Sequence, residues 1–220
     1  MRNSFSLNDF ERVPVVGILR GMLLAQIEPL VQAAVEGGLT TLEITLNSPG
    51  AVDQIRRAVS LSAGALNIGA GTVTTVALLD EALEAGAGFI VTPVVNEEVI
   101  RRCVDSKIPV FPGAFTPTEI LRAWDLGATM VKVFPAEVLG PAYIKSVKAP
   151  LPQVRLMPTG GVDLESLSAY RAAGADAFGV GSPLFRSDRI AASDWAWVRA
   201  QCRAFVERSS LTTGLDKPRG

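Results

Sequence analysis

The feature that most constrains the fold is a pattern that occurs four times: an amphipathic helical stretch, a glycine-containing junction and then an apolar strand. The junction glycines are Gly38, Gly86, Gly127 and Gly174, and the intervals between them are 48, 41 and 47 residues. One strand–helix–strand unit occupies roughly 30 or more residues, so each interval has room for a second strand and helix. The pattern therefore predicts further strands midway between these junctions.

Four more short apolar runs fit this spacing, at residues 13–19, 66–73, 108–115 and 153–162. Eight strands thus alternate with eight helical stretches, which is typical of an α/β protein with a parallel sheet. We predict a single (β/α)8 TIM barrel with a short N-terminal helix over residues 1–210, and a disordered tail at 211–220. An open doubly wound sheet is the alternative, and the absence of a dinucleotide-binding fingerprint favours the barrel.

Composition and charge exclude several function classes. The chain has 21 basic and 22 acidic residues, a balance that predicts neither a nucleic-acid nor a membrane partner. It has no histidine, which excludes Ser-His and Cys-His nucleophile pairs and His-based metal sites. Two cysteines are too few for a disulfide framework and are interpreted as packing residues. No long apolar run and no signal-peptide core is present, so we expect a cytoplasmic protein.

Lys132 is a lone charge in the apolar run MVKVFPAE, residues 130–137. Because a strand alternates its faces, Met130, Lys132 and Phe134 point to one side, and both faces have apolar neighbours. One interpretation is an edge-strand lysine whose stem covers apolar surface while its ammonium group reaches water. The other is a desolvated lysine with a lowered pKa, whose neutral amine is a nucleophile.

Glu43 is a second lone charge, in the run LTTLEITL at residues 39–46. Taken alone, it can be a rim carboxylate paired with a surface lysine. Burying either charge by itself is unfavourable, whereas a Lys–Glu pair inside one barrel is tolerable. Together, Lys132 and Glu43 favour a chemical role, because Schiff-base chemistry on a ketone requires a desolvated amine and a carboxylate that moves protons.

Glycine-rich turns follow the last two predicted strands, in PTGGVD at residues 158–163 and GVGSPL at residues 179–184. In a barrel the chemistry lies at the carboxyl ends of the strands, and phosphate often binds after the last two. Backbone N–H groups at helix N-termini bind phosphate without help from lysine or arginine. Ordinary turns are the alternative, but two such motifs at the two expected places favour a phosphate site.

The motifs LEITLNSP, GAGTV, VTP, KVFPAE and PTGGV, in this order, resemble those of the 2-keto-3-deoxy-6-phosphogluconate and 2-keto-3-deoxy-6-phosphogalactonate aldolases. The resemblance covers nearly all of residues 13–186. It implies a class I aldolase with no metal and no cofactor, in which Lys132 forms the Schiff base and Glu43 is the general acid and base. It further implies pyruvate-pocket walls at Thr72 and Pro93. The implied phosphate cradle consists of Gly160, Gly161, Gly181 and Ser182.

One position separates the two branches of this family. The gluconate branch typically has an arginine for the substrate carboxylate where this chain has Asn47, and asparagine supplies no charge. Arg20, at the end of the first predicted strand, can reach the same place with a bidentate guanidinium. The segments ILRG, LNSP and GPAYIK are similar to the galactonate branch, whereas Thr159 matches the gluconate branch, in which it contacts sugar hydroxyls. The substrate's configuration at C4 therefore stays open.

The resemblance implies cleavage of a phosphorylated keto acid, either of the two C4 epimers, to pyruvate and glyceraldehyde 3-phosphate. It also implies a homo-oligomer, since the family is usually trimeric. Two other classes stay open. A phosphate-binding barrel isomerase or epimerase would share the glycine turns but has no use for an imine-forming lysine, and a non-catalytic sugar-phosphate-binding protein would keep only the pocket.

Overall fold

A computed structural model of the chain describes residues 4–210, so the predicted disordered tail at 211–220 lies outside the described residues. The chain opens with the predicted short helix, α1 (Leu7–Arg12), and strands and helices then alternate. The strands are β1 (Val15–Leu19), β2 (Thr41–Thr45), β3 (Asn67–Gly71), β4 (Ile90–Val91), β5 (Val110–Phe111), β6 (Gly113–Ala114), β7 (Val131–Val133), β8 (Leu156–Pro158) and β9 (Phe178–Val180). The remaining helices are α2 (Leu24–Glu36), α3 (Ala51–Ser62), α4 (Val76–Glu84), α5 (Glu97–Asp105), α6 (Pro117–Asp125), the 3₁₀ helix η1 (Ala136–Val138), α7 (Gly140–Lys148), α8 (Leu167–Ala172), α9 (Ser187–Ala191) and α10 (Trp195–Ser210).

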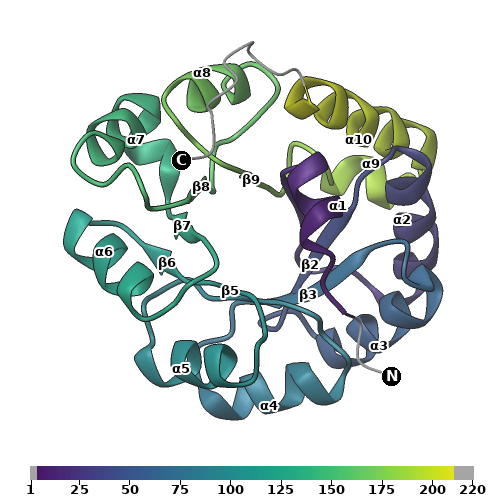
Figure 1. Cartoon of the computed structure of the whole chain (residues 1–220). Helices are drawn as coiled ribbons and strands as arrows, with labels where there is room; N and C mark the ends of the chain where they lie inside the picture. The colour runs from purple at the N-terminus through teal and green to yellow at the C-terminus, as the bar shows by residue number, and fades with distance from the viewer. Residues whose placement is uncertain (1–3, 211–220) are drawn as a thin grey trace.

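All strand pairs are parallel, and they form two sheets. Six strands pair in the order β5-β4-β3-β2-β1-β9, and three pair in the order β6-β7-β8. The larger sheet curls, and the helices surround the strands (Figure 1). The α/β class and the parallel sheet that we predicted are therefore present.

The strands do not form the single eight-stranded sheet that we predicted. The predicted strand at 108–115 is divided into β5 and β6 at Pro112, which has no N–H to donate to a neighbouring strand. β5 pairs with β4 and β6 pairs with β7, so the division separates the two sheets. On the other side, an isolated parallel bridge between Thr159 and Gly179 links the ends of β8 and β9.

Two of the helices begin with side-chain caps. Thr116 and Glu119 form a capping box at the start of α6, with Pro117 in the first turn. The Asn96 side chain accepts hydrogen bonds from the backbone N–H groups of Glu98 and Val99 at the start of α5. These local caps set where each helix leaves the strand before it.

Helix α1 covers the end of the sheet where the strands begin. The backbone N–H of Ser6 donates to Oδ1 of Asn67, the first residue of β3, over 2.7 Å. Phe10 of α1 is fully buried, and its ring stacks on Phe111 with centroids 5.6 Å apart. Because α1 occupies the amino ends of the strands, the carboxyl ends are left for a site.

The two cysteines are packing residues, as predicted. Cys103 and Cys202 are buried free thiols, and burial raises the pKa of each to about 12. Thiols with such high pKa values are largely protonated near neutral pH and are weak nucleophiles. Within residues 4–210, no helix combines the length and the apolar character needed to cross a membrane.

Candidate active site

Lys132 is buried in the middle of a sheet. Its strand, β7, lies between β6 and β8, and the side chain is 4% exposed. The interpretation of Lys132 as an edge-strand lysine that reaches water is therefore wrong. Burial lowers the pKa of Lys132, the Arg20 charge lowers it further, and the Glu43 charge acts in the opposite direction. The environment thus favours the neutral, nucleophilic amine.

Glu43 is buried in β2, where all five residues are buried. Burial raises the pKa of Glu43, and the charges of Lys132 and Arg20 oppose this shift. Its Oε2 atom has no hydrogen-bond partner among the described residues. Gly71, at the end of β3, leaves room for this carboxyl group, since a Cβ at that position would overlap with Oε1 of Glu43. A buried carboxyl with a raised pKa is suited to both accepting and donating a proton.

A cleft of about 510 Å³ opens at the carboxyl ends of the strands. It brings together six of the predicted site residues, namely Arg20, Thr159, Gly160, Gly161, Gly181 and Ser182. The other five predicted site residues do not line it: Glu43, Asn47, Thr72, Pro93 and Lys132. Phe134, two residues after Lys132, does line the cleft, and its ring centroid lies 4.9 Å from the Lys132 Nζ atom, so the buried amine lies next to the cleft.

The glycine turns form one side of this cleft. Gly160 and Gly161, directly after Thr159, have φ angles of +93° and +71°, which residues other than glycine rarely adopt. Gly181 and Ser182 directly follow β9, the strand whose Gly179 forms the bridge with Thr159. Two adjacent turns that expose backbone N–H groups can hold an anion such as phosphate.

Thr72 and Pro93 follow the neighbouring strands β3 and β4. Thr72 has a φ of +58°, an uncommon conformation for a residue with a branched side chain, and such positions concentrate at functional sites. Gly113 of β6 leaves space for the backbone of Pro93, with which a Cβ would overlap. Both residues are half-buried and lie at the carboxyl ends of strands of the larger sheet, whereas Lys132 belongs to the smaller sheet.

Arg20 and Asn47 differ in their placement. Both are exposed, and Arg20 lines the cleft whereas Asn47 does not. Within residues 4–210, no carboxylate forms an ion pair with Arg20. Its guanidinium is thus available for an anionic ligand, in keeping with the predicted exchange of roles between positions 20 and 47.

Residues 7–201 of the chain match the model of a known protein family, described as KDPG and KHG aldolase. The chain belongs to this family. The predicted resemblance is therefore confirmed, and with it the prediction of an aldolase.

Relatives in both branches of the KDPG and KHG aldolases are similar to this chain. A probable 2-dehydro-3-deoxy-6-phosphogalactonate aldolase of Rhizobium meliloti (strain 1021) is 40% identical over 174 residues, which cover 79% of this chain and 82% of the relative. A 2-dehydro-3-deoxy-phosphogluconate aldolase of Pseudomonas aeruginosa is 39% identical over 197 residues, 89% of this chain and 88% of the relative.

Solved aldolase structures have the same fold. A native KDPGal structure superposes with a TM-score of 0.84 at 34% identity, and the match covers 94% of this chain and 97% of the chain in that structure. The KDPG aldolase of Legionella pneumophila, with pyruvate captured as a covalent carbinolamine intermediate, has a TM-score of 0.81 at 28% identity, over 90% and 96% of the two chains.

Sequence reasoning missed several residues of the aldolase cleft. The Phe134 ring centroid lies 4.9 Å from the Lys132 Nζ atom, and the alternation of strand faces had already put the two side chains on one side. Glu137 also lines the cleft, next to Gly161, and no role was predicted for it. Ser48 and Gln54, which bond to the turn after Arg20, gave no signal in the sequence because the contacts span 27 and 32 residues.

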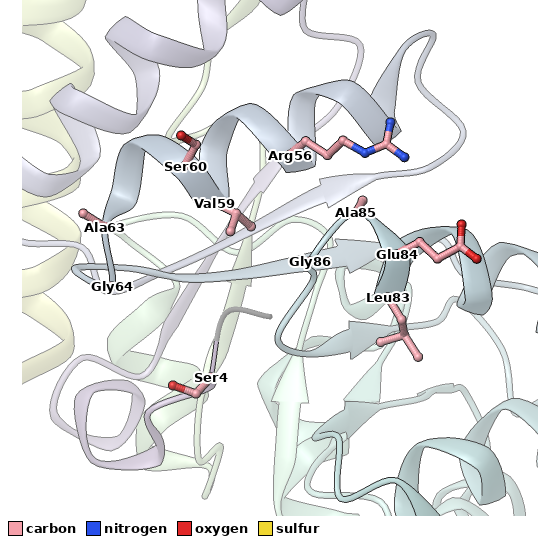
Figure 2. A pocket seen from close by; sticks show the side chains of 10 residues that line it. All are labelled: Ser4, Arg56, Val59, Ser60, Ala63, Gly64, Leu83, Glu84, Ala85 and Gly86. Atoms are coloured by element: carbon pink, nitrogen blue, oxygen red, sulfur yellow. The ribbon is translucent and has the colours of Figure 1, made fainter. Parts of the chain in front are cut away.

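A second cavity, of about 850 Å³, lies away from the predicted site. Figure 2 shows that Arg56, Val59 and Ser60 line it from α3, while Glu84 and Gly86 line it from the end of α4 and the following turn. None of the predicted site residues lines this cavity. The smaller cleft, which six of the predicted site residues line, is therefore the candidate site.

Proposed function

We propose that this protein is a class I aldolase that cleaves 2-keto-3-deoxy-6-phosphogalactonate, its gluconate epimer or both to pyruvate and glyceraldehyde 3-phosphate. The observation that carries the proposal is the buried Lys132 amine, with a lowered pKa, next to a residue that lines a cleft at the carboxyl ends of the strands. The names of relatives in both aldolase branches support the substrate class.

Lys132 starts the reaction. Its neutral amine attacks the C2 carbonyl of the keto acid to form a carbinolamine, which loses water to give an iminium ion. The iminium draws electrons from the C3–C4 bond. Burial of Lys132 lowers its pKa and favours the neutral amine before attack.

Glu43 moves the protons. It removes the proton of the C4 hydroxyl, directly or through a water molecule, while the C3–C4 bond breaks and glyceraldehyde 3-phosphate leaves. The remaining enamine takes a proton at C3, and water then hydrolyses the iminium to release pyruvate and the free amine. The raised pKa of Glu43 suits it to hold the proton between these two steps.

The two ends of the substrate are held by different parts of the cleft. Arg20 binds the carboxylate, in the role that Asn47 is unable to fill, and Thr72 and Pro93 form the wall against the pyruvate part. Gly160, Gly161, Gly181 and Ser182 hold the phosphate with backbone N–H groups and the serine hydroxyl. Fixing both ends aligns the C3–C4 bond with the iminium.

Thr159 contacts the hydroxyl at C4. It is buried and lines the cleft between the lysine side and the glycine turns. Because the galactonate-like segments outnumber this gluconate-like threonine, we propose turnover of the galactonate compound with appreciable activity on its epimer.

We further propose the molecular setting that goes with this activity. The two sheets together make a barrel, and residues 1–210 are one domain; the Thr159–Gly179 bridge between the sheets and the passage of the chain from one sheet to the other at Pro112 support this. The enzyme works in the cytoplasm as a homotrimer, as is usual in the family, and needs no cofactor.

The test is borohydride trapping with pyruvate, followed by mass spectrometry of peptides. We expect one reduced adduct on Lys132 and none in the Lys132→Ala or Lys132→Arg variants. An adduct on Lys107, Lys145 or Lys148, or no adduct, would reject the mechanism. The same experiment separates an aldolase from an isomerase or a binding protein, since neither of these forms an imine with pyruvate.

A further inference from the structure

We infer that Ser48 and Gln54 are positioning residues that hold Arg20 in place for the carboxylate of the substrate. The inference rests on the role proposed for Arg20. It starts from two buried polar side chains that both bond to the short turn after β1, although they come from the loop after β2 and from α3.

Ser48 holds the residue after Arg20. Its Oγ accepts a hydrogen bond from the backbone N–H of Gly21 over 2.7 Å and lies 3.0 Å from the hydroxyl of Thr45, the last residue of β2. Ser48 is 6% exposed and Thr45 is fully buried. These contacts thereby connect the turn after β1 to the buried end of β2.

Gln54 holds the next residue along. Its amide nitrogen donates to the carbonyl of Met22 over 2.7 Å and to the carbonyl of Pro49 over 3.0 Å. The side chain is 1% exposed, and its Oε1 atom has no hydrogen-bond partner among the described residues. A glutamine buried with one unpaired oxygen is unfavourable for stability. The contribution of Gln54 is therefore the two hydrogen bonds that it donates to the neighbouring loops.

Arg20 needs this support because its own side chain has no ion pair among the described residues that would hold it. Its backbone directly follows β1, and its exposed side chain has no ion-pair partner within residues 4–210. Gly21 has a φ of +69°, so the chain bends sharply there. If the bonds to Gly21 and Met22 are lost, the turn gains freedom, and a guanidinium at the end of a long side chain loses its alignment with a carboxylate.

The first experiment measures steady-state kinetics of Ser48→Ala with the phosphorylated keto acid. We expect KM to rise about tenfold, the size of one lost buried hydrogen bond, with kcat within about twofold of the wild type. Ser48→Thr keeps the hydroxyl and should restore most of the affinity. Ser62→Ala, which removes another buried serine hydroxyl bonded within α3, should leave KM unchanged.

A second variant separates positioning from folding. Gln54→Leu removes the bonds to Met22 and Pro49 and also removes the unpaired oxygen, so stability should not fall by much. We expect KM to rise for this variant as well. A Gln54→Leu enzyme with unchanged KM, together with a Ser48→Ala enzyme that is merely less stable, would overturn the inference.

A double-mutant cycle with Arg20→Ala gives the decisive result. If Ser48 acts through Arg20, Ser48→Ala should raise KM in the wild type but leave it unchanged in Arg20→Ala. Equal effects in both backgrounds would overturn the inference. Failure of the proposed function would be seen separately, because the wild type would then form no pyruvate adduct on Lys132.

Discussion

Gly71 and Glu43 share one small space between neighbouring strands. A Cβ on Gly71 would overlap with the carboxyl group of Glu43, so the absence of a side chain at position 71 sets where this carboxyl can lie. The glycine therefore belongs to the site as much as the acid does.

We predict that Gly71→Ala lowers kcat by about tenfold or more. The added methyl group would displace the Glu43 carboxyl, and catalysis depends on where this carboxyl lies. The crowding should also lower the free energy of unfolding by about 1–3 kcal/mol. Steady-state kinetics and urea denaturation measure the two effects. A variant with wild-type kcat would show that catalysis does not depend on the position of the Glu43 carboxyl.

Replacement of the acid itself tests its chemistry. Glu43→Gln keeps the shape and should leave substrate binding nearly unchanged, while kcat falls by roughly 10²–10⁴, the range for losing a general acid–base. Single-turnover kinetics with the wild type as control would show which step slows. A kcat within a few-fold of the wild type would remove Glu43 from the proton transfers.

The buried lysine should weaken the fold at neutral pH. Because the pKa of Lys132 is lower in the folded state than its ordinary value of 10.5, the unfolded chain binds an extra proton between these two values. This lysine's contribution to the free energy of unfolding therefore becomes more favourable as pH increases toward 10.5.

Lys132→Met lacks this titration, so its stability relative to the wild type should be greatest near pH 7. The difference should shrink as the pH approaches 10, and urea denaturation at several pH values measures it. A stability difference that is the same at all these pH values would contradict a lowered pKa.

Arg20 is predicted to supply the charge that is missing at position 47. Arg20→Ala should lower kcat/KM by about 10–100-fold, in line with the loss of a charge-assisted hydrogen bond of about 1.5–3 kcal/mol. Asn47→Ala is the matched control and should change kcat/KM by little. If the two variants behave alike, the carboxylate is bound elsewhere.

Thr159 is predicted to decide how well the enzyme separates the C4 epimers. The wild type should use the galactonate compound and retain activity on the gluconate epimer, with discrimination of about 1–3 kcal/mol. Thr159→Val removes the hydroxyl at nearly constant volume and should lower activity on the gluconate epimer more than on the other. Measurement of kcat/KM on both compounds is the check, and exclusive use of the gluconate epimer would reject the assignment.

Much of the fold was predictable because its signals are local. Apolar runs and junction glycines located the segments that contain the strands, and a capping box at Thr116–Glu119 marks the start of α6, since each depends on residues only a few positions apart. Pro112 was visible in the sequence, yet the division of its strand was missed because an apolar run alone does not show which backbone groups must pair.

The sequence by itself pointed to the residues that we propose carry the chemistry. A lysine and a glutamate in apolar strands are recognisable from their neighbours, and the surrounding motifs identify the family. Only the tertiary structure decided that Lys132 is central in its sheet, that Arg20 but not Asn47 lines the cleft, and that Ser48 and Gln54 meet the turn after β1. The physical reason is distance along the chain: burial, pKa and loop contacts depend on groups that only folding brings together.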